Sequence, residues 1–262
     1  MTRIVAALDN SLAARPVIAT ALALGRLLGA GVDPLHVRRD GTAAARSAAD
    51  AAGLPLRVVG GSVNERLIEA AAEEDVVAIV IGARGTPAAR RPLGSTALAV
   101  ASRALQAIVV VPPEALSRER LRKVLVPIEA HVSPLLTPRA IVELASGVEI
   151  DAAVLHVYDE SSLPAFTDQP QHEHDAWARE FVRRWCPWGV DAVELVLRVG
   201  RADEVVPRTA DELHVDLIAL GWAQELAAGR APVVRATLER ASVPVMLVPV
   251  IVGAPSTLPA AV

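Results

Sequence analysis

The chain contains an internal repeat. Residues 3–9 read RIVAALD and residues 123–129 read KVLVPIE, so an apolar segment that ends in an acidic residue recurs after 120 positions. The tripeptide Leu-His-Val at residues 35–37 recurs at residues 155–157 with the same offset. Self-similarity over such a span indicates two copies of one folding unit. A chain of 262 residues has room for two ordinary domains, and the repeat predicts that both share a fold.

The offset between the copies changes along the chain. Gly82 aligns with Gly221 at an offset of 139, so the second copy carries 19 additional residues (139 − 120) after its second strand. The offset falls to 137 where the apolar segment 108–112 aligns with 245–249. We predict one domain at residues 1–114, a second at 121–250 and a flexible tail at 251–262.

Each copy alternates short apolar segments with alanine-rich segments. Hydrophobic residues make up 52% of the chain and aromatic residues only 3%, which suits buried parallel strands covered by helices. In the first copy we expect strands at Ile4–Leu8, Val32–Val37, Leu56–Val59, Val76–Ile81 and Ala107–Val111, and helices at Leu12–Leu28, Thr42–Ala52, Val63–Glu74 and Ser95–Leu105. The pattern predicts an α/β fold of two tandem domains, each an open five-stranded parallel sheet with helices on both faces.

A glycine-containing loop follows the fourth expected strand. Residues 76–96 read VVAIVIGARGTPAARRPLGST: the apolar run ends at Gly82, a basic loop contains Arg84 and Gly85, and Gly94-Ser95-Thr96 opens a helical segment. A strand, a glycine loop and a helix N-terminus bind phosphate well, because backbone N–H groups approach the anion and the helix dipole favours it. The alternative is an ordinary βα turn with a solvated basic loop, and short glycine patterns also match by chance.

Asp9 stands at the end of the first expected strand. In an open parallel sheet, ligands bind at the carboxyl ends of the strands, so Asp9 and Gly82 are expected to face one crevice. The carboxylate suits hydrogen bonds from a ribose or an adenine amine. It also suits the N-cap of a helix that begins near Leu12, and Ser95 suits the N-cap of the later helix.

Other polar and aromatic residues favour structural roles. His36 and His156 occupy equivalent places inside apolar strands and are expected to bond neighbouring backbone groups. The tract His172–Asp175 lacks the spacing of a metal site, and Cys186 suits a small apolar position. Trp177, Phe181, Trp185 and Trp188 indicate an amphipathic helix. The sequence has no P-loop, no dinucleotide fingerprint after the first strand and no nucleophile elbow.

Charge and composition exclude several classes of partner. A formal net charge of −4 gives no general electrostatic reason to expect nucleic acid or an anionic membrane. The chain has a single cysteine and no apolar run of membrane-spanning length, so we expect a soluble protein of the reducing cytoplasm.

Taken in this order and repeated, these segments resemble the universal stress protein family in its tandem two-domain form. The resemblance rests on the strand that ends in Asp9, on Leu35–Val37, on the helix start at Gly61–Glu65, on the loop from Gly82 to Ser95 and on the closing strand before Pro112. It implies the five-stranded fold shared with adenine nucleotide alpha hydrolases. It also implies that ATP, with or without Mg²⁺, occupies a G-x2-G-x9-G-[ST] loop.

By this resemblance nine residues form the nucleotide site. Asp9 and Val37 contact the adenosine, and Ala7 stands where nucleotide-binding members commonly have proline. Gly82, Arg84 and Gly85 line the phosphate path, while Gly94, Ser95 and Thr96 hold the outer phosphates. Eight residues separate Gly85 from Gly94, one fewer than the family pattern.

The second copy departs further from the pattern. Glu129 replaces Asp9, Trp222-Ala223-Gln224 replaces the segment with the second glycine, and Ala231-Pro232 replaces Gly94-Ser95. Proline removes an N–H donor and adds bulk where phosphate would lie, and Trp222 has the size to fill the crevice. We expect no nucleotide in the second domain.

Three functions are compatible with these features. The leading one is a stress-response regulatory protein that binds ATP or a related adenine nucleotide in the first domain. The family's pairing through last strands implies an intrachain pseudo-dimer of Ile108–Val111 with Val245–Val248, with a homodimer and an unidentified protein partner left open. The alternative is an interaction module without nucleotide. The third is a slow ATPase, for which the sequence shows no evident catalytic base.

Overall fold

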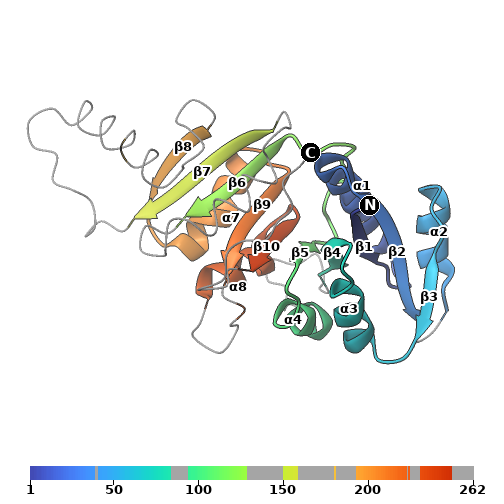
Figure 1. Ribbon diagram of the computed structural model, residues 1–262. Coiled ribbons are helices and arrows are strands. Elements are labelled where there is room, and N and C mark those ends of the chain that lie inside the picture. The colour runs from blue at the N-terminus through green and yellow to red at the C-terminus, as the bar shows by residue number, and fades with distance from the viewer. Residues whose placement is uncertain are drawn as a thin grey trace, which may run out of the picture.

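The structure is a computed structural model that describes residues 1–38, 41–83, 94–128, 150–158, 180, 193–222, 224 and 231–249. Its ten strands form one sheet in the order β3-β2-β1-β4-β5-β10-β9-β6-β7-β8 (Figure 1). The expected α/β fold is confirmed: a mostly parallel open sheet carries helices on both faces.

The first half of the sheet contains the strands of the first copy. They are β1 (Arg3–Ala7), β2 (Gly31–Arg38), β3 (Arg57–Gly60), β4 (Val76–Gly82) and β5 (Ala107–Val111). The helices between them are α1 (Ala14–Leu28), α2 (Ala43–Ala51), α3 (Val63–Ala71) and α4 (Ser95–Ala101). In the central strand β1, Ile4, Val5 and Ala6 are fully buried, because helices cover both faces of a parallel sheet.

The second half repeats this arrangement. Its strands are β6 (Lys123–Ile128), β7 (Asp151–Tyr158), β8 (Val193–Val199), β9 (Leu217–Trp222) and β10 (Val245–Pro249), and its described helices include α7 (Ala202–Glu212) and α8 (Pro232–Arg240). In each half the first strand lies between the second and the fourth. The strand order therefore reverses beside β1 and beside β6, and a ligand crevice is expected at those points.

The two halves join through their last strands. β5 and β10 pair antiparallel, with Ile108 opposite Leu247 and Val110 opposite Val245, whereas every other strand pair in the described sheet is parallel. The expected pairing of the closing strands thus occurs within one chain.

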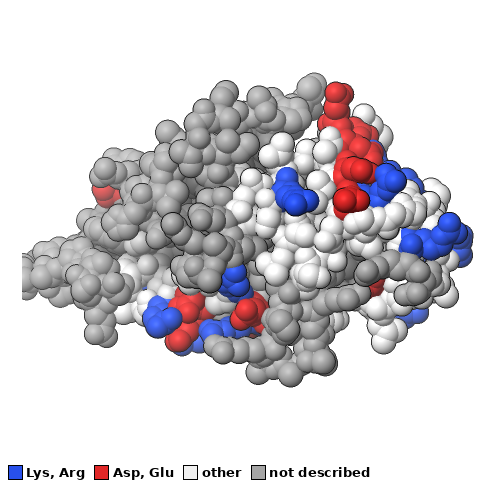
Figure 2. All heavy atoms as spheres, turned by 90° about the horizontal axis from the view of Figure 1, so that it is seen from below, with Lys and Arg blue, Asp and Glu red and all other residues white. Residues whose placement is uncertain are grey.

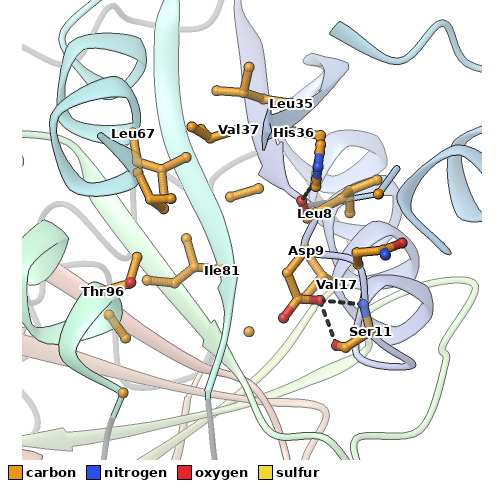
Figure 3. A pocket seen from close by; sticks show the side chains of 17 residues that line it. Leu8, Asp9, Ser11, Val17, Leu35, His36, Val37, Leu67, Ile81 and Thr96 are labelled. Carbon is orange, nitrogen blue, oxygen red and sulfur yellow. Dashed lines mark hydrogen bonds between the residues drawn. The ribbon is translucent and has the colours of Figure 1, made fainter. Parts of the chain in front are cut away.

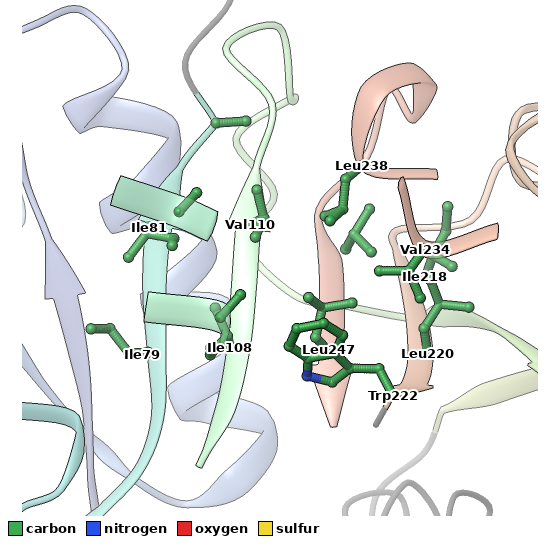
Figure 4. Packing of buried hydrophobic residues seen from close by; sticks show 14 of the residues in the cluster. Ile79, Ile81, Ile108, Val110, Ile218, Leu220, Trp222, Val234, Leu238 and Leu247 are labelled. Carbon is green, nitrogen blue, oxygen red and sulfur yellow. The ribbon is translucent and has the colours of Figure 1, made fainter. Parts of the chain in front are cut away.

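Two hydrophobic clusters cover the two faces of the sheet. One contains side chains of α3, α4, α7 and α8 and continues across the β5–β10 pair, where Ile108 lies opposite Leu247 (Figure 4). The other contains side chains of α1 and α2. Because both clusters include residues of both halves, the halves share a continuous core.

Several helix boundaries differ from the expected ones. α1 begins at Ala14 and not at Leu12, which is 89% exposed and lies in a turn after β1. α3 ends at Ala71 and α4 at Ala101, three and four residues earlier than expected, because turns follow both helices. The histidine tract, the aromatic segment 177–188 with Cys186, and the tail 251–262 lie outside the described residues.

The described surface offers few clues to a macromolecular partner. On the face shown in Figure 2 the acidic and basic side chains are interspersed, so the described part of that face carries no extended basic patch. Among the described residues, no helix combines the length and apolar character that crossing a membrane requires.

Candidate functional site

A pocket of about 300 Å³ lies at the carboxyl ends of β1, β2 and β4, where the strand order of the first half reverses (Figure 3). Segments far apart in sequence contribute to it: the β1–α1 turn, the end of β2, α3, the end of β4 and the start of α4. Its lining comprises Ala7, Leu8, Asp9, Asn10, Ser11, Val17, Leu35, His36, Val37, Gly41, Val63, Leu67, Ile81, Gly82, Gly94, Thr96 and Ala97.

Asp9 organises the turn between β1 and α1. Its Oδ1 accepts hydrogen bonds from the backbone N–H of Ser11 at 3.2 Å and from Ser11 Oγ at 2.5 Å, and Ser11 Oγ accepts one from the N–H of Ala13 at 3.1 Å. The expected N-cap role of Asp9 is wrong, because the N-cap is Ala13 and no side chain caps this helix. The exposed carboxylate instead stands at the mouth of the pocket.

The inner wall of the pocket is apolar. Val37 and Leu35 come from β2, Ile81 from β4, and Val63 and Leu67 from α3 (Figure 3). Val37, Leu35, Leu67 and Ile81 are at most 7% exposed, and they belong to the cluster on the α3–α4 face. The pocket therefore combines an apolar wall with the polar groups of the Asp9 turn.

His36 occupies the other face of β2. Its Nδ1 lies 2.8 Å from the carbonyl oxygen of Leu8, and the side chain is 4% exposed. A carbonyl only accepts hydrogen bonds, so Nδ1 donates. The expected structural role is therefore confirmed: the imidazole ties the end of β2 to the end of β1, directly before Asp9.

The start of α4 borders the pocket on the side of β4. Gly94 is the N-cap, with extended backbone angles of −62° and 143°, and Thr96 and Ala97 line the pocket. The expectation that Ser95 is the N-cap is wrong, because Gly94 is the N-cap and Ser95 is the first residue of the helix. Ser95 is exposed and is not part of the lining.

Gly82 ends β4 beside α1. A Cβ built at this position would lie 3.6 Å from Val17 Cγ2 and 3.7 Å from Ala13 Cβ, which are ordinary contacts. Its φ lies outside the left-handed region. Neither backbone conformation nor packing of the described residues therefore demands glycine here.

Six of the nine residues expected from the sequence line this one pocket: Ala7, Asp9, Val37, Gly82, Gly94 and Thr96. Ser95 lies next to it, and Arg84 and Gly85 fall in the segment 84–93, outside the described residues. The lining also includes residues that were not predicted as part of the site, among them Asn10, Ser11, Gly41, Val63 and Leu67. The i, i+4 spacing of Val63 and Leu67 on an amphipathic helix was a signal for the last two.

The corresponding place in the second half has a different composition. Trp222 follows Gly221 at the end of β9, is 3% exposed and packs in the hydrophobic cluster (Figure 4). Gln224 and Ala231 have left-handed backbone conformations with φ of 58° and 46°. Pro232 occupies the first turn of α8, and Glu129 lies outside the described residues.

Within the described part of the chain, no cluster of His, Cys, Asp and Glu has the composition of a metal site. The polar groups at the pocket mouth are the carboxylate, amide and hydroxyl groups of Asp9, Asn10, Ser11 and Thr96. The described lining therefore offers one apolar wall and one polar edge.

The comparisons with known proteins agree with this architecture. The model of the universal stress protein family matches residues 39–112 and 120–249. A search of curated proteins found no match.

Solved structures resemble the whole chain. A functionally unknown protein from Pseudomonas aeruginosa PAO1 has a TM-score of 0.66 at 13% identity, with 95% of this chain and 93% of that chain covered. A universal stress protein from Archaeoglobus fulgidus DSM 4304 has a TM-score of 0.61 at 15% identity, with 94% and 97% covered. At these identities the likeness shows the fold.

Proposed function

The chain belongs to the universal stress protein family, and on this premise we propose that its first half binds one adenine nucleotide, ATP, in the pocket at the ends of β1, β2 and β4. The observation that carries the proposal is the composition of this pocket. Six residues expected for a nucleotide site, spread between positions 7 and 96, line a single cavity.

The apolar wall suits the adenine ring. Val37, Leu67 and Ile81 are buried aliphatic side chains that present a surface against which a flat base gains contact area. The backbone of Val37 at the end of β2 supplies polar groups for the ring edge, as the family resemblance implies.

The polar edge suits the ribose and the phosphates. Asp9 Oδ1 is used by Ser11, and among the described residues Oδ2 accepts no hydrogen bond, so it is available to a ribose hydroxyl. Gly94 and Thr96 are then the groups nearest the phosphates, together with Arg84 and Gly85 by the family pattern. Mg²⁺ would bind to the phosphates.

The second half is proposed to bind no nucleotide. The indole of Trp222 occupies buried space at the end of β9, and proline replaces an N–H donor at the start of α8. The two halves act as an intrachain pseudo-dimer through β5 and β10. ATP occupancy then serves as a regulatory signal to a protein partner in the cytoplasm and not as fuel for rapid turnover.

The nucleotide content of the purified protein tests this function. The protein is denatured, and the supernatant is analysed by ion-exchange chromatography. The proposal expects adenine nucleotide near one equivalent per chain, or a rise in Tm when millimolar Mg-ATP is added to the empty protein. Absence of both would contradict it and would favour a module that acts through partner contacts alone.

A further inference from the structure

Gln224 connects the second half of the chain to the helix that borders the pocket. Its Nε2 donates a hydrogen bond to the carbonyl oxygen of Ala104 at 2.5 Å, across 120 positions of sequence. Ala104 is 2% exposed and comes shortly after α4, so this bond joins the segment after β9 to the segment after α4.

The position of Gln224 in the repeat is informative. At the offset of 139 it aligns with Gly85, the second glycine of the expected phosphate loop. It has a left-handed backbone with φ of 58°, a conformation that glycine adopts far more readily than glutamine. The glutamine side chain supplies a hydrogen-bond donor to Ala104 that a glycine would lack.

α4 needs such a contact because its own packing is modest. The helix has seven residues and is therefore about 10 Å long, too short to be stable without tertiary contacts. Its buried side chains are Ala97, Val100 and Ala101, which are small and bury little apolar area.

The turn that contains Ala104 is continuous with α4. The N–H of Ala104 donates to Val100 O at 2.9 Å, so the bonded carbonyl belongs to the turn that directly continues the helix. At the other end Gly94, Thr96 and Ala97 line the pocket. A displacement of the Ala104 end therefore shifts or tilts the end that faces the ligand.

We propose that Gln224 is a positioning residue for the first-half site: this residue, which aligns with Gly85 of the first copy, braces α4 from its far end. The nucleotide-free half thereby supports the nucleotide-binding half. This inference rests on the proposed function for its effect on ATP. The stabilisation of α4 by Gln224 does not depend on a ligand and can be measured without one.

Gln224→Gly tests the brace. Glycine accommodates the left-handed backbone, so the fold is preserved while the hydrogen bond is lost. The matched control is His214→Gly, because His214 also has a positive φ, 50°, and lies in the exposed turn after α7. A second variant, Gln224→Glu, replaces the donor by a carboxylate that faces a carbonyl oxygen.

Two measurements on the full chain decide the outcome. Hydrogen–deuterium exchange without nucleotide should become about two- to tenfold faster for amides of residues 95–104 in both Gln224 variants and stay unchanged in His214→Gly. By isothermal titration, the Kd for ATP should rise by about two- to tenfold in both Gln224 variants and not in the control.

Each contrary result has a distinct meaning. Unchanged exchange in both Gln224 variants would overturn the brace. Faster exchange with an unchanged Kd would overturn the positioning role, since a merely structural contact alters the stability of α4 without altering affinity. A wild type that binds no ATP would contradict the proposed function, and the exchange comparison would still support or overturn the hold of Gln224 on α4.

Discussion

His36 Nδ1 lies 2.8 Å from the carbonyl oxygen of Leu8, and the same contact recurs between His156 and Ile128 at 3.3 Å. The two pairs are separated by 120 residues, the offset of the repeat. The contact is present in the half with the pocket and in the half where Trp222 is buried. It therefore serves the fold, and in the first half it also fixes the strand end from which Asp9 projects.

His36→Leu should destabilise the protein, because the leucine side chain cannot donate to the carbonyl of Leu8. We expect a loss of about 1–3 kcal/mol in the free energy of unfolding, measured by urea denaturation. His36→Asn is the control, since its amide nitrogen lies close to the position of Nδ1 and still donates. Equal losses in both variants would show that ring packing and not the hydrogen bond is responsible.

Asp9→Asn should separate the local role of Asp9 from its role toward the ligand. The asparagine oxygen can still accept from Ser11, so we expect little change in Tm. Replacing a charged acceptor by a neutral one should weaken ATP binding by about fivefold, measured by isothermal titration. Ser11→Ala is the comparison: it removes a bond to Asp9 but leaves the charge, and its effect on affinity should be smaller.

An ion-pair cluster at the opposite end of the sheet should make stability depend on pH. Arg3 bonds Asp75 at 2.8 Å and also contacts Glu73, which Arg57 holds at 3.1 Å. The Arg3 hydrogen bond lowers the pKa of Asp75 below 3.8. Burial raises the pKa of Glu73, but the hydrogen bonds from Arg3 and Arg57 together lower it by more. The pKa of Glu73 is therefore below 4.5.

Both carboxyl groups have a lower pKa in the folded state than in the unfolded state. Their contribution to the stability of the fold is therefore complete at pH values above the unfolded-state pKa values, and it is lost as the pH falls through the folded-state pKa values. The difference in stability between wild type and Arg3→Met should therefore be largest at pH 7 and should shrink below about pH 4.5. Thermal unfolding over this range measures it. Arg15→Met, which removes an exposed charge from α1, is the control; a parallel pH profile for both variants would contradict the assignment.

Asp216 should be important for the second half. This carboxylate is 6% exposed, and it accepts from the N–H groups of Arg122 at 2.7 Å and Lys123 at 3.1 Å, while Arg118 Nε lies 3.0 Å away. Asp216→Ala leaves two backbone donors without an acceptor and should cost about 2–4 kcal/mol in chemical denaturation. Asp216→Asn keeps an acceptor, so it should cost clearly less. A similar loss in both variants would assign the effect to the charge.

The sequence predicted the fold well because the repeat and the β/α alternation are properties of local pattern. The strand Ala107–Val111 is found as expected, and the closing strands pair. The predicted helix boundaries were less accurate where side-chain hydrogen bonds form a turn in place of the first helical turn. Asp9 and Ser11 form their own turn, which delays α1 to Ala14.

The site was predictable in part. Residues at strand ends, such as Asp9 and Gly82, converge because topology brings the carboxyl ends of neighbouring strands together. Leu67 was not singled out, since its place in the wall depends on how α3 packs on the sheet. The bond from Gln224 to Ala104 was also inaccessible, because it depends on how the two halves join. The ligand contacts of all nine predicted site residues stay predictions.

The most direct test of one nucleotide site in the first half is isothermal titration of the full chain with Mg-ATP, on wild type, Gly94→Asp and Gly94→Asn. Both replacements are favourable N-caps for α4, so the fold is retained, and they differ mainly in charge. We expect a stoichiometry near one ATP per chain for wild type, and an affinity at least about tenfold weaker for Gly94→Asp than for Gly94→Asn, since a carboxylate there repels phosphate. No binding, two ATP per chain, or equal affinities of the two variants would contradict the account.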